Sequence, residues 1–223
     1  MTGTPAAPTP DRTAGIHHVT AIAGDPQGNL YFYRAVLGLR LVKRTVNFDD
    51  PGSYHFYFGD ERGSPGAIMT FFPWPGAPRG TRGSGSVTAS AFSVPVGSLA
   101  WWAERLGGMG VGGVAECVRF GQRVLAFEDH DGTALELIET PGVERLPAFT
   151  GGGVVADRAV RGFHSVTLSL RSVDHTAGLL TRHLGLSAAR VEGARVRFAA
   201  DGGTVGTLID LLHTPDLPPG ESG

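Results

Sequence analysis

Two segments of this chain, which begin 147 positions apart (162 minus 15), have nearly the same sequence pattern. The first is GIHHVTAIAGDPQGNLYFYRAVLGLRLV, residues 15–42, and the second is GFHSVTLSLRSVDHTAGLLTRHLGLSAARV, residues 162–191. The identical positions keep that offset: Gly15, His17, Val19, Thr20, Leu37, Gly38 and Leu39 match Gly162, His164, Val166, Thr167, Leu184, Gly185 and Leu186. A fixed period is the mark of a repeated structural unit. The chain is therefore predicted to contain copies of one unit.

The matches continue after an offset change, which locates a loop of different length in the two copies. Phe58, Gly66 and Ile68 match Phe198, Gly206 and Leu208 at an offset of 140 (198 minus 58). A seven-residue difference (147 minus 140) around TVNFDDP explains the change. In each copy an apolar strand leads into a helix and then into further strands. The first helix has Asp25 as a plausible N-cap and Gly38 just after its end.

A third segment of the same design lies between the two copies. GSVTASAFSVP reads as a strand, SLAWWAERLGGMG as a helix, and RVLAFEDHDGT and ALELIE as later strands. The sequence therefore predicts an α+β fold built from a βαβββ module that occurs three times. The predicted modules span residues 15–80, 85–142 and 161–214. A disordered leader (1–14) precedes them, a linker (143–160) separates the second from the third, and a connector (215–223) follows the third.

Composition excludes several classes of function. The net charge is −2, from 19 basic and 21 acidic residues, and the basic residues are scattered, so neither nucleic acid nor an anionic membrane is an expected partner. No apolar run approaches the roughly 20 residues that span a bilayer. The single cysteine, Cys117, fits a reducing compartment, and a cytoplasmic location is expected. We expect its thiol to be buried and inert.

The repeat unit resembles the module of the vicinal oxygen chelate superfamily, which includes glyoxalases, bleomycin-resistance proteins and extradiol dioxygenases. Within it, the stretch GIHHVTAIAGDPQGNLYFYRAVLGLRLVKRTVNFDDPGSYHFYFGDERGSPGAIMTFFPWPGAPRG is most similar to dioxygenases that cleave the rings of hydroquinones and catechols. The resemblance extends through GFHSVTL to the end of the chain. It implies that the modules pair into cup-shaped mixed sheets, with Fe(II) as the expected metal and a small aromatic compound as the substrate.

The resemblance also implies which residues hold the metal. Family members have four modules, and the iron ligands come from the first and the last. The second histidine of HHVT, here His18, is the expected ligand from the first module. The other two, a histidine and a glutamate, belong to a fourth module, and residues 215–223 align with the connector that leads into it. The chain on this interpretation lacks two of three ligands, and another divalent metal or none is an open alternative.

Equivalent slots in the other modules can be read from the same alignment. In the superfamily a glutamate ligand sits in the last strand of a module. The equivalent position is Thr70 in module one, Glu136 in module two and Asp210 in module three, so Glu136 is the second candidate metal ligand. The histidine slot holds Ala89 in module two and Ser165 in module three. A cup with two acids and no imidazole is a poor iron site. For Glu136 we favour a partly buried polar remnant over a working metal ligand.

Three more residues are expected beside the substrate as catalytic groups. His17 precedes His18, and because neighbouring side chains of a strand alternate, it is expected to point to the opposite face, under the helix or behind the metal ligand. Thr20 lies two residues beyond His18 and so on its face. His55, in YHFYFGD, can line the same cup. His164 aligns with His17 and is expected to be structural, whereas His130, His175, His183 and His213 are expected at the surface.

Two other functions compete with ring cleavage. One is a metal-free binding protein of the same superfamily that holds a small aromatic ligand, for which Trp74, Trp101 and Trp102 are candidates although a core role is favoured. The other is a recombined remnant in which module one exposes the face that a fourth module would cover. An uncovered half-cup invites pairing across a two-fold axis, so a homodimer or higher homo-oligomer is expected.

Overall fold

The computed structural model describes residues 13–200 and 206–221, so the expected leader falls almost entirely outside the described residues. Within them, the order of one strand, one helix and three strands occurs three times. The first copy contains β1 (His18–Ala23), α1 (Pro26–Tyr31), a π-helical turn (Phe32–Val36), β2 (Arg40–Val46), β3 (Tyr54–Gly59) and β4 (Ile68–Pro73). The second contains β5 (Ser86–Val94), α2 (Leu99–Gly108), β6 (Ala115–Arg119), β7 (Gln122–Glu128) and β8 (Ala134–Glu139). The third contains β9 (Phe163–Leu170), α3 (Asp174–Arg182), β10 (Ser187–Glu192), β11 (Arg195–Ala199) and β12 (Leu208–His213). The predicted α+β class is confirmed.

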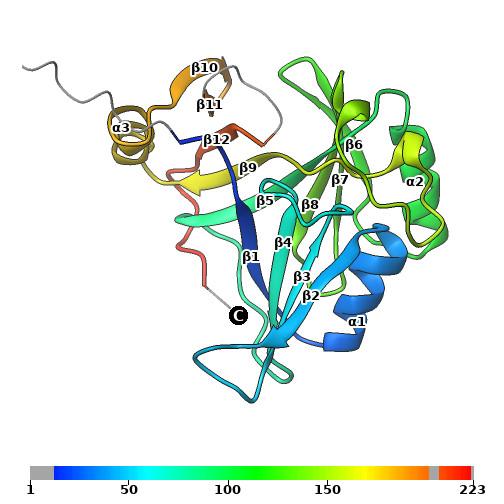
Figure 1. Cartoon of the computed structure of the whole chain (residues 1–223). Coiled ribbons are helices and arrows are strands. Elements are labelled where there is room, and N and C mark those ends of the chain that lie inside the picture. Colours follow the sequence, from blue (N-terminus) through cyan, green and yellow to red (C-terminus); the bar gives the residue numbers. More distant parts are fainter. Residues whose placement is uncertain (1–12, 201–205, 222–223) are drawn as a thin grey trace, which may run out of the picture.

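The three copies, called modules one, two and three below, do not pair equally. Modules two and three share an eight-stranded sheet in the order β10-β11-β12-β9-β5-β8-β7-β6, in which β5 and β9 join the two halves in antiparallel fashion. Module one forms its own four-stranded sheet, β1-β4-β3-β2. The strand β1 pairs on one side only, with β4, among the described residues. Figure 1 shows this blue-to-cyan sheet beside the green strands of module two.

The main core lies where modules one and two face each other. Tyr33 from the π-helical turn stacks on Phe58 and lies against Phe71 of the first sheet. Trp102 of α2 and Phe163 of β9 are fully buried in the same cluster. A second, smaller cluster lies under α3, which Figure 1 places on the side of the molecule away from α1 and α2. Its buried members are Leu180, Leu186, Phe198, Ala200 and Leu211.

Local signals in the sequence account for how the first helix begins and ends. The Asp25 carboxylate accepts hydrogen bonds from the backbone N–H groups of Gln27 and Gly28, at 3.2 and 2.7 Å, as the N-cap prediction requires. Gly38 has φ +69°, and a Cβ there would lie 2.6 Å from Cγ2 of Val154. Only glycine avoids both penalties at that position.

The segment between modules two and three is packed rather than loose. Val154, Ala159 and Val160 are buried in the main core. The guanidinium of Arg105 on α2 donates to the carbonyls of Ala35 and Val36 at 2.6 and 2.9 Å, and to that of Gly152 as well. Residues 143–160 therefore link modules one and two by direct contact.

The exposure of the cysteine and of most histidines and tryptophans was predicted from the sequence. Cys117 lies exposed on β6, so the expectation of a buried thiol is wrong: β6 is an edge strand of the large sheet, and its residues Ala115 to Val118 are all exposed. His130, His175, His183 and His213 are exposed, as expected. Among the tryptophans Trp102 is buried in the core, as favoured, whereas Trp74 is exposed. No helix in the described part of the chain is long and apolar enough to cross a membrane.

Candidate functional site

One face of the first sheet packs on the core, and its other face carries a row of polar side chains. The pairing registers place Thr20 beside Thr70, Thr70 beside Tyr57, and Tyr57 beside Lys43, so these residues cross β1, β4, β3 and β2 at one level. Alternation places His18 on the same face, at a neighbouring level. The intervening residues, such as Met69, Phe71, Phe56 and Phe58, are buried in the core. This polar side is called the outer face of the first sheet below.

Hydrogen bonds fix the two ends of that row. Thr70 is buried, and its hydroxyl donates to Oγ1 of Thr20 at 2.8 Å. The Tyr57 hydroxyl and Nδ1 of His55 are 3.0 Å apart, and Nζ of Lys43 lies 5.3 Å from the centre of the Tyr57 ring. These contacts orient Thr20, Tyr57 and His55 before any ligand arrives.

His55 is held between aromatic rings. Its ring centroid lies 4.2 Å from that of Tyr57 and 4.0 Å from that of Phe72, with which it stacks. Phe72 in turn stacks at 6.3 Å with Trp74. Burial, followed by the charges of Lys43 and His18, lowers the pKa of His55 from its usual value. The neutral imidazole is therefore favoured at pH 7, and its Nε2 atom is buried without a hydrogen-bond partner among the described residues.

His17 and His18 share one environment, so the prediction that they point to opposite faces is wrong. Their Nδ1 atoms are 3.0 Å apart, their rings meet edge to face at 5.2 Å, and both side chains are exposed. The reason is that β1 begins at His18. His17 precedes the first paired residue, so strand pleating does not set the direction of its side chain. The contact uses Nδ1 of His18 and leaves Nε2 available for a ligand.

The described residues do not complete a metal site. A metal centre in this type of fold takes three protein ligands, and imidazole and carboxylate are the groups that suit iron. No group of three or more His, Cys, Asp or Glu side chains that could hold a metal is present in the described ranges. His18 supplies one imidazole, and Glu136 lies in the other sheet. The structure does not bring these two candidate ligands together.

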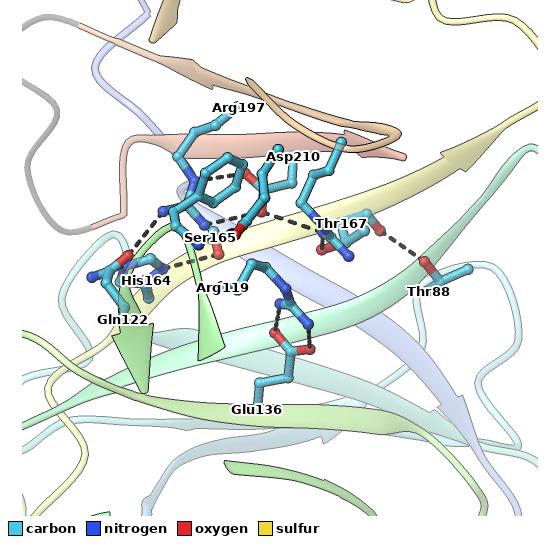
Figure 2. A network of polar contacts seen from close by, with 12 residues as sticks. Thr88, Arg119, Gln122, Glu136, His164, Ser165, Thr167, Arg197 and Asp210 are labelled. Carbon is cyan, nitrogen blue, oxygen red and sulfur yellow. Dashed lines mark hydrogen bonds and ion pairs between the residues drawn. The ribbon is translucent and has the colours of Figure 1, made fainter. Parts of the chain in front are cut away.

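Glu136 instead lies in a cluster of buried ion pairs, where modules two and three each pair an acid with arginines of the same module (Figure 2). Arg119 binds both oxygens of Glu136, at 2.7 and 2.9 Å. Arg197 binds both oxygens of Asp210, at 2.8 and 3.0 Å, and Arg195 adds a contact of 3.3 Å. Both acids of the expected degenerate cup are thus neutralised by arginines. The metal role of Glu136 stays a prediction, and it would require breaking the bidentate pair.

His164 completes the network from β9. It is 2% exposed, its Nε2 lies 3.2 Å from the Gln122 amide nitrogen, and its Nδ1 lies 3.0 Å from the Ser165 hydroxyl. Burial, followed by the charge of Arg197, lowers the pKa of His164 to about 4. The imidazole is therefore neutral at physiological pH and is a fixed part of the interior.

Two hollows flank the unpaired side of β1. The larger, about 510 Å³, is lined by Ile22–Gly24, by Arg79–Arg82 and by Gly220 and Glu221, among others. The smaller, about 170 Å³, lies between Val19–Ala21 of β1 and Val87–Ser90 of β5. The open edge of the first sheet is thus bordered by space and by the last described residues of the chain.

Tyr57, Lys43 and the three arginines that bind Glu136 and Asp210 were not predicted from the sequence. A signal existed for some of them. His55 and Tyr57 are two residues apart in a strand and so share a face, and Arg195 and Arg197 are related in the same way. For Lys43 and Arg119 the signal was absent, because their partners are set by strand register rather than by spacing.

The fold places the chain in a class of modular proteins that are built from repeated βαβββ units. A family model described as "Glyoxalase/Bleomycin resistance protein/Dioxygenase superfamily" matches residues 15–137. That is more than half of the 223 residues. The chain belongs to this superfamily, as the resemblance implied.

Several relatives carry names that refer to ring cleavage. The chain is 47% identical over 204 residues to "Putative ring-cleaving dioxygenase MhqO" of Bacillus subtilis, a match that covers 92% of this chain and 64% of that protein. It is 35% identical to "Chlorohydroquinone/hydroquinone 1,2-dioxygenase" of Sphingobium indicum, over 95% of this chain and 67% of that protein. The chain thus spans about two thirds of the length of the relatives it matches.

Solved structures give the same picture of the fold. A crystal structure described as a putative dioxygenase from Bacillus subtilis superposes with a TM-score of 0.89 at 46% identity, covering 95% of this chain and 67% of that one. Glyoxalase I from Zea mays superposes with a TM-score of 0.71 at 14% identity, over 93% and 71% of the two chains, which supports the fold alone.

Proposed function

We propose that this chain is, or is part of, a dioxygenase that cleaves the ring of a hydroquinone or a catechol. The observation that carries the proposal is the outer face of the first sheet, where His18 and Thr20 share a face with Tyr57 and with His55, which stacks on Phe72. The chain is also 35% identical to a named hydroquinone dioxygenase. Stacked rings suit an aromatic substrate, and hydroxyl and imidazole groups suit its phenolic hydroxyls.

The protein's own groups would bind the diol and move its protons. Thr20 is fixed by Thr70 and faces the same side as His18, so its hydroxyl can orient a substrate oxygen. A neutral imidazole accepts a proton from a phenol as the hydroxyl ionises, and His55 offers such a group, while His17 places a second imidazole beside His18. His17, Thr20 and His55 are accordingly the proposed catalytic residues.

Superfamily members of this kind generally use a metal, and we propose Fe(II) here with His18 as one ligand. Because three ligands are not assembled within the described residues, the others would come from polypeptide that packs along the free edge of β1. The antiparallel pairing of β5 with β9 is a model for such an addition. The hollow of about 510 Å³, lined in part by Glu221, lies at that edge.

Anaerobic loading with Fe(II), followed by metal analysis and oxygen uptake with a panel of hydroquinones and catechols, tests the proposal. We expect bound iron, oxygen uptake with at least one diol, and a ring-opened product. His18→Ala should abolish both iron retention and uptake. His213→Ala, which changes an exposed histidine on β12, is the matched control and should behave as wild type. Equal uptake by the His18→Ala protein would refute the role of His18.

A second candidate function is metal-free binding of a small aromatic ligand. The observation in its favour is that one imidazole without a neighbouring carboxylate is a weak metal site. Stoichiometric binding of a diol by iron-free protein, with no oxygen uptake after iron loading, would favour this function over ring cleavage.

We also propose a homodimer or higher homo-oligomer in the cytoplasm. The unpaired side of β1 supports the proposed assembly, since exposed strand edges pair readily. The single cysteine supports the proposed cytoplasmic location, where thiols stay reduced. Sedimentation velocity over a concentration series should give a dimer or larger species, and a monomer at every concentration would contradict the assembly.

A further inference from the structure

We propose that the two-residue turn of Phe120 and Gly121 is a strained latch, which closes the cup between modules two and three and opens while module one stays folded. This turn joins β6 to β7, and Arg119 pairs with Gln122 across it. The strands β6 and β10 are the two end strands of the eight-stranded sheet. Contacts from the turn to β10 therefore hold the two ends of the curled sheet together.

The first argument is backbone strain at Phe120. Its φ is +50°, and among the described residues it is the only one other than glycine with a positive φ. Gly121 follows with φ +75°. A two-residue turn with two positive φ values is of type I′, which favours asparagine before glycine, so a bulky ring at the first position is strained. Such strain persists only where surrounding contacts hold it, and it is common in clamps and switches.

The second argument is the set of contacts that holds the strained turn in place. The Phe120 N–H donates to a carboxylate oxygen of Glu192 at 2.5 Å, and the Phe120 carbonyl accepts from Nη1 of Arg190 at 2.7 Å. The Cζ atoms of Arg190 and Arg197 lie 5.7 and 4.2 Å from the centre of the Phe120 ring. The ring is buried although it belongs to a turn. All three partners belong to module three, so closure of the cup is what offsets the strain.

The third argument is that β10 is weakly held apart from these contacts. All six of its residues are exposed, and within the described part of the chain it pairs only with β11. A register shift interrupts that pairing between Ala188 and Arg190. Segments with exposed backbone hydrogen bonds and few buried contacts open at a lower free energy than the core does. Release of the turn should therefore free β10 and leave the four strands of module one in place.

The latch also controls the access of water to the buried ion pairs. Arg119, just before the turn, binds Glu136, and Gln122, just after it, accepts from Nη1 of Arg197 at 2.9 Å (Figure 2). The turn thus lies beside the ion pairs of both modules. In the closed state these charges are shielded from solvent, and in the open state the cup presents them to it.

Hydrogen exchange of the whole chain, followed by mass spectrometry at pH 7, tests the latch. In wild type the paired amides of β10 and the amides of residues 119–122 should exchange faster than those of β9 and β12, at rates that low urea leaves unchanged. Arg190→Met removes the bond to the Phe120 carbonyl and one cation–π contact, so it should speed exchange in both segments about tenfold or more. Glu192→Gln should have a smaller effect, because its amide oxygen still accepts the Phe120 N–H.

Val191→Thr is the matched control, because Val191 lies on β10 between two latch partners and is 71% exposed. This variant should exchange as wild type does, and no variant should change exchange in β1, β3 and β4. Equal exchange in wild type and Arg190→Met, or an increase of the same size in module one, would overturn the proposal. Should Arg190→Met fail to fold, wild type decides: exchange in β10 and residues 119–122 that rises with urea in step with β9 and β12 would overturn it too.

Discussion

Removal of the Asp210 carboxylate should cause one of the largest losses of stability available to a single substitution in this protein. Asp210 is fully buried and accepts from Arg197 at 2.8 and 3.0 Å and from Arg195 at 3.3 Å. Arg195 and Arg197 are 13% and 5% exposed, so neither cation can be solvated if its partner is lost. Breaking a buried pair by removing one partner costs about 3–5 kcal/mol.

The perturbation is Asp210→Asn, which keeps the shape and removes the charge. Urea unfolding at pH 7, followed by circular dichroism, should show a lower midpoint and a loss of about 3 kcal/mol or more. Glu116→Gln is the matched control, because the Glu116–Arg123 pair is 46% and 50% exposed and should contribute less than about 1 kcal/mol.

A double substitution separates the cost of an unpaired charge from the value of the pair. Asp210→Leu with Arg197→Met replaces the pair by apolar side chains, and should recover much of the loss seen in Asp210→Asn. An Asp210→Asn protein within about 1 kcal/mol of wild type would refute the view that a compensated charge network fills this cup.

Two further predictions concern other positions. Because the pKa of His164 is about 4 in the folded protein against 6.5 unfolded, its neutral form contributes stability above pH 6.5 that is lost as pH falls toward 4, by about 3 kcal/mol in total. Urea midpoints at pH 7 and 4.5 should therefore differ less for His164→Asn than for wild type, and identical pH slopes would contradict this. Gly38→Ala puts an alanine where the backbone φ is +69°, and its Cβ would lie 2.6 Å from Cγ2 of Val154. Thermal scans should show a loss of roughly 1–3 kcal/mol, and an unchanged midpoint would contradict the strain.

Periodicity and local chemistry made the modules predictable from sequence. The offset of identical residues located the repeats, and Asp25 and Gly38 marked the ends of the first helix correctly. These features depend on neighbours in the chain, so a single sequence contains them. Which modules share a sheet depends on contacts between distant strands, and nothing in the spacing indicated that β5 would pair with β9.

The candidate site was predictable in its parts and not in its arrangement. The slot positions of Glu136 and Asp210 followed from the alignment of the modules, but their arginine partners depend on strand register. The contact between His17 and His18 also escaped prediction, because it depends on where β1 begins.

The repeated unit has different side chains lining its sheet in different modules of this chain. The sheet of module one has a polar outer face on which Nε2 of His55 has no hydrogen-bond partner in the described part of the chain, whereas the cup between modules two and three is filled by ion pairs. The contrast follows from a few positions. Where module one has His18 and Thr70, module three has Ser165 and Asp210, and the acid there is bound by arginine.

We expect aromatic diols to bind on the outer face of the first sheet. Amide chemical-shift mapping by NMR, with hydroquinone titrated into the protein under nitrogen, tests it most directly. Binding on this face should give saturable shifts in β1, β3 and β4, centred on His18, His55 and Tyr57, and no shifts in β9, β11 and β12. Saturable shifts confined to the strands around Glu136 and Asp210 would contradict it.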